Sequence, residues 1–520
     1  MRRSSLGFMV VFWVVLVFVG FVWGEQKRGD EVSPQPGRGS ESSETDALPP
    51  SGLSETRHVL GLADEKLAYV AVAGTLPVKI RKNGSRCRIF FVAYELEGTK
   101  AASRPLTFVF NGGPGASAAY LHLGAMGPRI VEFGKEGTLS EPSVSLVENA
   151  RTWLRFTDLV FVDPVGTGYS RCVTDGGSDK KGKEESAAWG VEEDFTAVAE
   201  FVRLYLTRRG RWTSPKYLAG ESYGGFRVAG LSGHLQSNGI GVNGMILISP
   251  VLEFGSLSED AYRLLPWIVR IPSYAATARR HGKARGDLPE NNVRTALEGV
   301  ERFAVHDLLP ALANGRAELP CAQLAGFIGM SAQAVGRLHA RIPLSLYVKN
   351  LLSSSRRLIS VYDGSWTAID PNPGYPFPPA EDPLLARINL LLAPAFNAYI
   401  REDLGFETDL HYEILNRTVS KKWNWKSGMK SEQGFVGAAE DLKTAMSLNE
   451  NLKVLIVHGV FDLVTPYFGS VVVFRQMALD PSVESNFSLK VYEGGHMFYT
   501  HQRARLEFFE DARAFFGSHH

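Results

Sequence analysis

Short runs of consecutive apolar residues recur along much of the chain and predict buried β-strands. They lie at residues 106–110, 159–162, 217–220, 245–248 and 452–457. A helical pattern occupies residues 186–209, between the second run and the third. Strands that are apolar throughout and alternate with helices are typical of a mostly parallel sheet that is covered on both faces. The pattern therefore predicts an α/β fold with a mostly parallel central sheet flanked by helices.

The pattern also predicts the two ends of this sheet. Runs at residues 68–72 and 87–94 flank the dipeptide Asn83-Gly84, which is typical of an antiparallel hairpin at a sheet edge. A last strand is expected at residues 489–492. The C-terminal helix is expected to bury the face that carries Phe508, Ala512 and Phe515.

The strand pattern stops between residues 252 and 448, where helical segments and proline-rich loops follow one another. A long insertion at the carboxyl edge of such a sheet can cover a binding site. We therefore expect a largely helical cap insertion at 252–448. It would separate two parts of the core, at 61–251 and 449–520.

The N-terminus has the pattern of an export signal. Arg2 and Arg3 precede an apolar run at residues 7–22, and Gly24 is a possible cleavage point. The sequence predicts a signal peptide at 1–24, and a periplasmic or secreted protein. An uncleaved membrane anchor stays open, and no other stretch is expected to span a membrane. Residues 25–60, which are mostly small, polar or charged, are expected to be a disordered linker.

Composition and charge exclude some functions. The 520 residues include 56 basic and 55 acidic side chains, for a net charge of +1. This balance gives no reason to expect nucleic acid as a partner. The three cysteines allow at most one disulfide, whose pairing is left open, and do not form a zinc-ligand pattern. So few cysteines in an exported protein favour a bacterial periplasm.

The segment Gly220-Glu221-Ser222-Tyr223-Gly224 fits the G-x-S-x-G pattern of a strand-to-helix elbow. Glycines allow strand and helix to cross closely, and the tight turn exposes the serine hydroxyl at the carboxyl edge of the sheet. The chain has 52 glycines, so this pattern alone is weak evidence. Ser222 is the candidate nucleophile.

An acid and a histidine follow two later strands of the predicted sheet. Asp462 comes after the strand at 452–457, and His496 comes after the strand at 489–492. The order serine, acid, histidine is that of an α/β-hydrolase, in which the histidine takes the serine proton and the acid orients the imidazole. His458 and His501 are poorer candidates because His458 precedes the acid and His501 lies beyond the loop that follows the strand.

A glycine-rich loop, residues 111–115, follows the strand at 106–110. The backbone N–H groups of Gly113 and Tyr223 are expected to converge on the oxyanion that forms during acyl transfer. A plain glycine-rich turn is the alternative interpretation.

Three motifs in this order resemble the serine carboxypeptidase family. They are Asn111-Gly112-Gly113-Pro114-Gly115, the segment Asp163-Pro164-Val165-Gly166-Thr167-Gly168-Tyr169-Ser170, and Gly220-Glu221-Ser222-Tyr223-Gly224-Gly225. The resemblance extends from about residue 65 to residue 517. Prolyl aminopeptidases differ, since they usually have a histidine before Gly-Gly-Pro-Gly and an Asp-Gln-Arg-Gly segment.

The resemblance implies an α/β-hydrolase fold and a site for the free α-carboxylate of a peptide. Asn111, the Gly112 N–H and a protonated Glu221 would bind that carboxylate, and Met497 would line the pocket of the departing residue. No metal or cofactor is implied. The chain also departs from the family. Ala125 stands where relatives usually have a second glutamate, residues 249–251 read Ser-Pro-Val in place of Gly-Asn-Gly, and the cysteine framework of eukaryotic members is absent.

The sequence thus predicts an exported serine carboxypeptidase that acts on peptide or protein C-termini through an acyl-enzyme. An esterase or acyltransferase with the same fold is the first alternative. A binding protein without catalytic activity is the second. The preferred C-terminal residues and the oligomeric state stay open.

Overall fold

The structure is a computed structural model that describes residues 48–517 apart from 81–83, 136, 138–145, 174–184, 286–292, 317, 319 and 427–434. The predicted signal peptide therefore lies outside the described residues. So does Asn83 of the predicted hairpin turn.

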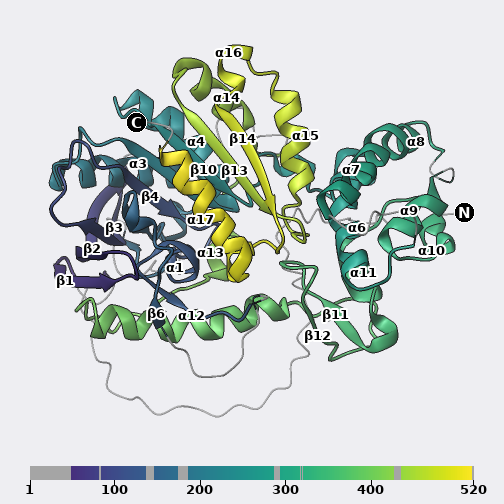
Figure 1. Cartoon of the computed structure of the whole chain (residues 1–520), viewed down its shortest axis with the longest axis horizontal. Coiled ribbons are helices and arrows are strands. Elements are labelled where there is room, and N and C mark those ends of the chain that lie inside the picture. The colour runs from purple at the N-terminus through teal and green to yellow at the C-terminus, as the bar shows by residue number, and fades with distance from the viewer. Residues whose placement is uncertain are drawn as a thin grey trace, which may run out of the picture.

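Within the described residues, ten strands form one large sheet, in the order β1-β2-β3-β7-β4-β9-β10-β13-β14 with β8 paired to β3 (Figure 1). The strands are β1 (Leu53–Gly61), β2 (Lys66–Ile80), β3 (Ser85–Leu96), β4 (Leu106–Phe110), β7 (Asp158–Val162), β8 (Arg171–Val173), β9 (Lys216–Glu221), β10 (Gly244–Ile248), β13 (Lys453–Gly459) and β14 (Phe487–Tyr492). Strands β7, β4, β9, β10, β13 and β14 are parallel. The pairs β1–β2, β2–β3, β3–β7 and β3–β8 are antiparallel. The predicted mostly parallel sheet is confirmed.

Alternate residues of the central strands enter two different hydrophobic cores. In β4, Phe108 and Phe110 lie in one core and Val109 in the other, as expected for a strand that is buried on both faces. The first core includes side chains of α3 (Val191–Arg208), α4 (Tyr223–Ser237) and α14 (Ala439–Leu448). The second includes side chains of α12 (Pro383–Glu402) and α17 (Gln502–Gly517). Helices therefore cover both faces.

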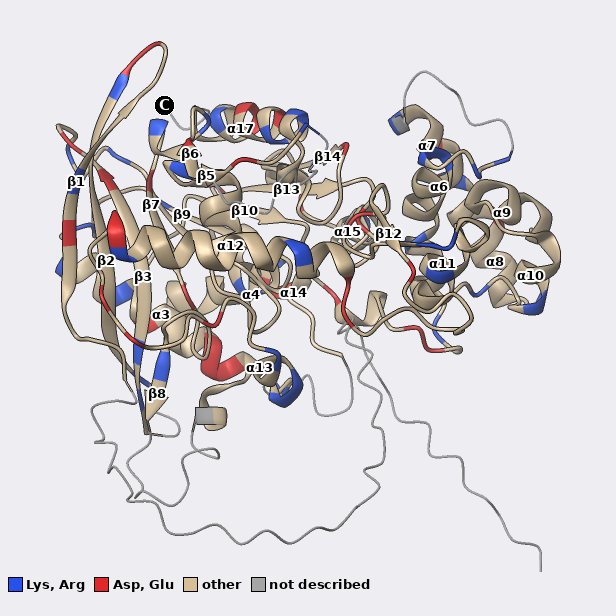
Figure 2. Cartoon of the chain, turned by 90° about the horizontal axis from the view of Figure 1, so that it is seen from below, with Lys and Arg blue, Asp and Glu red and all other residues tan. Residues whose placement is uncertain are grey.

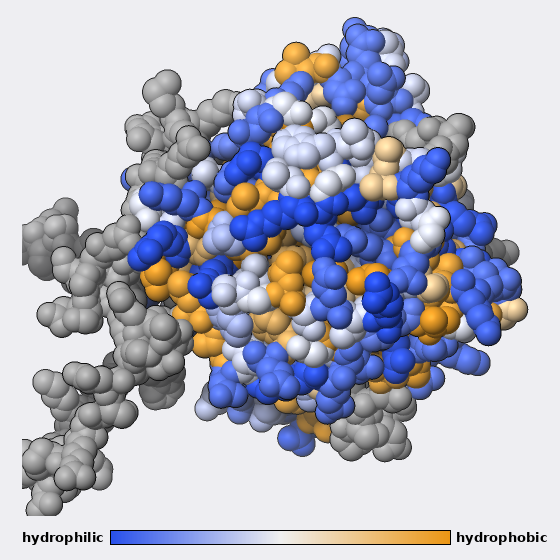
Figure 3. All heavy atoms as spheres, turned by 90° about the vertical axis from the view of Figure 1, so that its left-hand side faces the viewer, coloured by the Kyte–Doolittle hydropathy of each residue, from blue (hydrophilic) through white to orange (hydrophobic). Residues whose placement is uncertain are grey.

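Strand β1 corrects the last part of the disordered linker expected at residues 25–60, of which 25–47 lie outside the described residues. Residues 53–61 pair with β2 along their whole length. Most β1 side chains are exposed or half-buried, including those of Glu55 and Arg57. An edge strand that covers little apolar surface carries no continuous apolar run, and charged residues on such an edge discourage pairing with other chains. On the face shown in Figure 3, hydrophilic residues are mixed with apolar ones.

The stretch between β10 and β13 is not uniform. Its first part contains α5 (Leu265–Val269), α6 (Ile271–Arg280), α7 (Val293–Phe303), α8 (Leu309–Ala313), α9 (Cys321–Ile328), α10 (Ala332–Arg337) and α11 (Leu344–Asn350). These helices share a third core and lie to one side of the large sheet (Figure 1). By contrast, α12 and α14 pack in the two cores of the sheet. Only part of the predicted insertion therefore forms a separate helical group.

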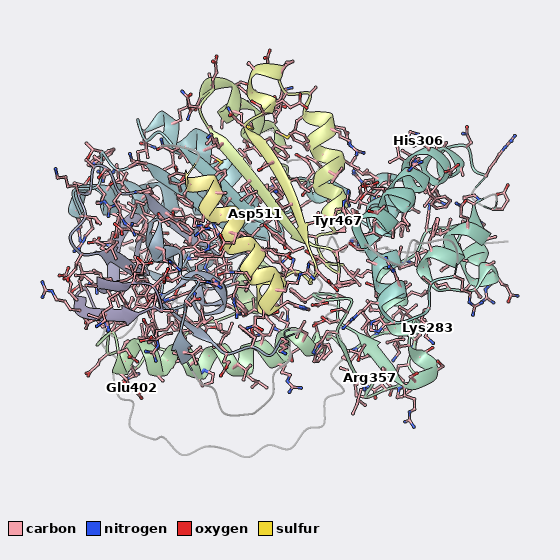
Figure 4. The ribbon with its side chains drawn as sticks, in the orientation of Figure 1. Lys283, His306, Arg357, Glu402, Tyr467 and Asp511 are labelled. Carbon is pink, nitrogen blue, oxygen red and sulfur yellow. A yellow bond between two sulfur atoms is a disulfide. The ribbon has the colours of Figure 1, made fainter. Side chains whose placement is uncertain are left out.

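The helical group contacts the rest of the molecule at α15 (Tyr467–Met477). Tyr467, at the start of α15, faces this group in Figure 4, and its hydroxyl donates a 2.6 Å hydrogen bond to Glu301 of α7. A short hairpin, β11 (Arg357–Ile359) and β12 (Thr367–Ile369), follows the group. The expectation of only helices and loops in this stretch is wrong for the hairpin, because three-residue strands are too short to produce an apolar pattern.

Several further elements are short. They include α1 (Ala119–Leu121), a π-helix (His122–Met126), the strand pair β5 (Arg129–Val131) and β6 (Leu146–Glu148), α13 (Arg417–Lys422) and α16 (Pro481–Glu484).

One helix among the described residues, α12, is long and apolar enough to cross a membrane by length and composition. The expectation that no stretch after the signal meets this criterion is therefore wrong. The side chains of Ile388, Leu392 and Phe396 in this helix are buried in the second core of the sheet. A helix in the core of a folded domain also passes this test of length and composition, and the burial of these side chains fits such a core helix.

Two further details of the core differ from the sequence pattern or complete it. On α17, Phe508, Ala512 and Phe516 are buried, whereas Phe515 is only half-buried. Phe509 is buried as well, so the buried face is turned away from Phe515. Cys87 of β3 and Cys172 of β8 oppose each other and form a disulfide, and Cys321 is buried and lies outside this disulfide. The prediction of at most one disulfide fits this arrangement.

Lys, Arg, Asp and Glu residues are spread over the described part of the molecule in Figure 2, and both signs alternate along α17. A surface on which both signs are mixed does not attract a polyanion as a field of one sign would.

Candidate active site

Ser222 lies in a sharp turn between β9 and α4. Its backbone angles are φ 61° and ψ −122°, a conformation that residues other than glycine rarely adopt. A Cβ atom on Gly220 would lie 2.1 Å from the carbonyl oxygen of Gly224, and one on Gly224 would lie 2.8 Å from that of Phe110. Only glycines therefore fit at these two positions, and the turn holds Ser222 at the carboxyl end of β9.

Asp462 and His496 are joined by a hydrogen bond. Asp462 lies in the loop after β13 and His496 in the loop after β14, and the Nδ1 atom of His496 is 2.8 Å from the Oδ2 atom of Asp462. The other carboxylate oxygen, Oδ1, accepts hydrogen bonds from the backbone N–H groups of Val464 and Thr465, each at 2.9 Å. The acid is therefore fixed from two sides, and it fixes the histidine ring in turn.

The electrostatics of this pair favour a charged acid and a basic histidine. Burial would raise the pKa of Asp462, but the adjacent His496 and the hydrogen bonds from Thr465 hold it below its usual value. Burial would lower the pKa of His496, but the Asp462 carboxylate raises it above its usual value. An imidazole with a raised pKa can accept a proton from a nearby hydroxyl group.

A loop of the β11–β12 hairpin contacts both loops that carry this pair, and its Tyr362 carbonyl oxygen accepts from the backbone N–H of His496. The backbone N–H of Leu463 donates to the carbonyl oxygen of Val361 at 3.1 Å. That of Gly364 donates to Phe461 at 2.8 Å. Sequence reasoning missed this contact, since nothing in the residues of the hairpin indicates which loops it meets in the fold.

Ser249, which follows β10, also connects the two loops. Its hydroxyl donates to the carbonyl oxygen of His496 at 2.8 Å, and its own carbonyl oxygen accepts from the Thr465 hydroxyl at 2.9 Å. This residue begins the segment Ser-Pro-Val that departs from the family motif. The departure from the family motif therefore marked Ser249 in the sequence, but the contacts of Ser249 with the two loops could not be predicted from it.

The predicted oxyanion donors lie near Ser222. Tyr223 is the first residue of α4, and a Cβ atom on Gly112 would lie 2.6 Å from its backbone nitrogen. Gly113 has φ 100° and lines the same pocket as Ser222. The first N–H groups of a helix have no partner inside the helix, so they are available to a developing negative charge.

Glu221 lies next to the nucleophile and is 3% exposed. The Nδ2 group of Asn111 donates to its Oε2 atom, and the hydroxyl of Tyr499 is 3.0 Å from both of its carboxyl oxygens. Burial raises the pKa of Glu221 to about 7, although His496 and these hydrogen bonds act in the opposite direction. The group can therefore carry a proton near neutral pH. Sequence reasoning missed Tyr499.

One pocket collects most of the predicted site residues. It is lined by Asn111, Gly112, Gly113, Glu221, Ser222, His496 and Met497. Asp462 and Tyr223 do not line it. The rest of the lining is mainly apolar or aromatic and comes from several elements: Ala116, Tyr120, Val251, Phe254, Leu257, Tyr362, Leu385, Leu415, Val464 and Thr465. The pocket can therefore hold an apolar chain beside a few polar groups.

The two histidines judged poorer candidates have other partners. The Nε2 atom of His458 is 2.8 Å from the hydroxyl of Ser470, and burial lowers its pKa to about 4. His501 is 2.8 Å from a carboxylate oxygen of Asp363 in the hairpin loop. In the part of the chain that the structure describes, no group of three or more His, Cys, Asp or Glu side chains could hold a metal ion.

The family model described as "Serine carboxypeptidase" matches residues 67–251. This segment is therefore similar to the serine carboxypeptidase family. The match covers β2 to β10 and so includes Asn111, Glu221 and Ser222, whereas Asp462 and His496 lie beyond it.

Two curated relatives are similar to part of the chain. Serine carboxypeptidase-like 46 of Arabidopsis thaliana is 29% identical over 177 residues, which are 32% of this chain and 34% of the relative. The pheromone-processing carboxypeptidase kex1 of Aspergillus niger is 32% identical over 181 residues, 34% of this chain and 26% of the relative. The matches thus span about a third or less of these relatives. Both come from a plant or a fungus, so the expectation of a bacterial-type serine carboxypeptidase finds no support.

A solved structure shows the same fold over most of the chain. It is Kex1(delta)p, a prohormone-processing carboxypeptidase from Saccharomyces cerevisiae, with a TM-score of 0.53 and 15% identity. The similarity covers 88% of this chain and 94% of that one. The chain has the α/β-hydrolase fold, as its sequence predicted.

Proposed function

We propose that this protein is an exported serine carboxypeptidase, which hydrolyses the last peptide bond of peptides or protein C-termini through an acyl-enzyme. The observation that carries the proposal is the position of Glu221. A buried carboxyl group with a pKa of about 7 lies beside the Ser222 nucleophile and in the same pocket. A hydrolase for simple esters has no need of such a group, whereas a carboxypeptidase must bind a free carboxylate.

The α-carboxylate of the substrate would meet three donors. They are the protonated carboxyl of Glu221, the side-chain amide of Asn111 and the N–H of Gly112. Two carboxyl groups at contact distance do not ionise together at low cost, so they share one proton. Met497 and the apolar lining would contact the side chain of the departing residue.

The reaction would begin with attack of the Ser222 oxygen on the carbonyl carbon of the last peptide bond. His496 takes the serine proton, Asp462 stabilises the imidazolium, and the N–H groups of Gly113 and Tyr223 bind the oxyanion. His496 then gives the proton to the leaving nitrogen, and the C-terminal amino acid departs. Water, deprotonated by His496, attacks the acyl-enzyme carbonyl. The bond to the Ser222 oxygen then breaks, His496 returns the proton to that oxygen, and the shortened peptide is released.

A library of N-blocked dipeptides, each as the free acid and as the C-terminal amide, tests the proposal. Mass spectrometry of the products should show release of the last residue from the free acids and slow or no cleavage of the amides. Equal cleavage of both forms would assign an esterase or endopeptidase activity to the site. Transfer of the acyl group to an added alcohol, in preference to water, would assign an acyltransferase.

Export is part of the proposal and depends on residues 1–24, which lie outside the described residues. N-terminal sequencing of the protein recovered outside the cytoplasm should begin at or after Glu25. A protein that keeps residues 1–24 and stays with the membrane fraction would be an anchored form. The division into a core at 61–251 and 449–520 with an insertion at 252–448 likewise stays a proposal.

A further inference from the structure

Tyr499 is a buried tyrosine whose hydroxyl group lies in the active site. It is 1% exposed and lies three residues after His496, in a turn of 3₁₀-helix, Phe498–Thr500. Its hydroxyl is equidistant, at 3.0 Å, from the Oε1 and Oε2 atoms of Glu221. The ring packs against Gly124, where a Cβ atom would lie 2.9 Å from the Cε2 atom of the tyrosine. The small residue at position 124 is therefore what admits the ring.

Asn111 fixes the other side of the same carboxyl group. Its Oδ1 atom accepts a hydrogen bond from the backbone N–H of Leu121 at 3.1 Å. Because an N–H group can only meet the oxygen of the amide, this contact defines the amide orientation and directs the Nδ2 donor at the Oε2 atom of Glu221. Among the described residues, no side-chain amide donates to the Oε1 atom of Glu221, which has the Tyr499 hydroxyl nearby. Because Oε2 already accepts a hydrogen bond from Asn111, Oε1 is the oxygen that can carry a proton toward a ligand.

We infer that Tyr499 is a positioning residue for Glu221, which holds its carboxyl group in the plane that presents the Oε1 proton to the substrate carboxylate. The inference rests on the proposed function and adds a residue to it. In this role the phenol never supplies the proton, because burial and the neighbouring Glu221 raise its own pKa well above the usual value. The substrate-binding proton is carried by Glu221 alone.

The groups that face Glu221 determine how its protonation responds to a change at Tyr499. They are His496 and Asp462 in the loops after β14 and β13, Tyr120 of α1, Tyr362 of the hairpin loop, and Tyr499 itself. The Tyr499 hydrogen bond stabilises the charged form of Glu221 and so lowers its pKa. Loss of the hydroxyl removes this effect, and Glu221 then keeps its proton to a higher pH.

The experiment measures ligand binding in the Ser222→Ala protein, which cannot turn over its ligand. N-benzyloxycarbonyl-Phe-Leu, chosen for the apolar pocket, and its C-terminal amide are titrated by calorimetry between pH 5 and pH 9. With Tyr499 present, affinity for the acid should be constant at low pH and fall roughly tenfold per pH unit above the pKa of Glu221, as expected for one linked proton. Affinity for the amide should show no such fall.

We call the pH at which affinity for the acid begins to fall the break. Tyr499→Phe in the same background should raise the break by about one pH unit, the size expected for a lost hydrogen bond to a charged group. It should also weaken binding of the acid several-fold at low pH, because the carboxyl group is no longer held, and leave amide binding unchanged. Tyr492→Phe is the matched control. Its hydroxyl donates to Asp511 of α17, labelled in Figure 4, at 2.8 Å, so the break should not move.

Glu221→Gln provides a second test that does not depend on the tolerance of the fold to Tyr499→Phe. The break should vanish in Glu221→Gln, and the double variant with Tyr499→Phe should show no pH effect of the second change. An unchanged break in Tyr499→Phe, with the parent break present, would overturn the role of Tyr499 alone. Absence of any preference for the acid over the amide in the parent would overturn the proposed function and this inference with it.

Discussion

The backbone N–H of His496 donates a hydrogen bond to the carbonyl oxygen of Tyr362 at 2.5 Å, and the two rings meet edge to face with their centroids 5.5 Å apart. Tyr362 belongs to the loop between β11 and β12, far from His496 in the sequence. The next residue, Asp363, pairs with His501 at 2.8 Å. The hairpin of the insertion therefore holds the loop that carries the candidate base.

Asp363→Ala should loosen this contact and move His496 away from its position. We expect kcat to fall roughly 10- to 100-fold for both peptide and ester substrates, since small displacements of a catalytic group have effects of this size. KM should change less. Asp480→Ala, which removes a helix-capping side chain at the start of α16, is the control and should leave kcat unchanged. Equal kcat values for the parent and Asp363→Ala would contradict the role of the hairpin.

Ser222→Ala should abolish peptide hydrolysis and covalent labelling by a fluorophosphonate probe while the fold is kept. Loss of a triad nucleophile typically costs several orders of magnitude in rate. Labelling is followed by intact-mass spectrometry and folding by circular dichroism. Near-parental turnover would show that the elbow does not supply the nucleophile.

His496→Ala and Asp462→Asn should each be severely impaired, and the double variant should be scarcely slower than His496→Ala alone. The reason is that the two residues act as one unit with Ser222, so their losses are not additive. The rates are measured with an activated ester as substrate. Independent, additive losses would indicate that one of the two residues has only a structural role.

The pH profiles of a free dipeptide and its amide should differ on the alkaline side. Below about pH 7 Glu221 is protonated and binds the substrate carboxylate, and above this pH it ionises and repels it. For the free acid, kcat/KM should therefore fall as the pH rises through the pKa of Glu221, mainly through KM. The amide has no carboxylate to repel, so its residual hydrolysis should follow His496, whose unprotonated form is required.

Glu221→Gln keeps a donor but cannot ionise, so it should remove the alkaline fall for the free acid. The profiles are obtained from initial rates across buffers of constant ionic strength. Identical profiles of acid and amide in the parent enzyme, with equal rates, would contradict the carboxypeptidase proposal.

Asp194→Ala should destabilise the fold through an unpaired buried charge. The Nε atom of Arg227 is 2.7 Å from Asp194, both side chains are at most 2% exposed, and Arg227 also donates to the carbonyl oxygen of Asn111. Removal of one partner of a buried pair costs about 3–5 kcal/mol. Urea denaturation measures this loss.

Glu200→Ala on the same helix is the matched control. Its pair with Arg203 is about one third exposed, so its loss should cost less than about 1 kcal/mol. Equal losses in the two variants would contradict the importance of burial at Asp194.

Local sequence determined the elements whose cause is local. The apolar runs predicted the buried strands, because a strand covered on both faces needs apolar residues at every position. The glycines around Ser222 predicted the elbow, because only glycine fits where two backbones cross at close range. The positions of Asp462 and His496 after the last two parallel strands predicted their meeting, because such strands end at one edge of the sheet.

Tertiary structure alone decided the contacts between segments that no local pattern connects. β1 is a strand because β2 offers it a partner, although its own side chains lack an apolar period. Tyr499 meets Glu221 because Gly124 leaves room for its ring, and Tyr362 meets His496 because a hairpin of the insertion packs there. Hydrogen bonds of this kind depend on where distant chain segments lie in space, and that position follows from the packing of the whole molecule.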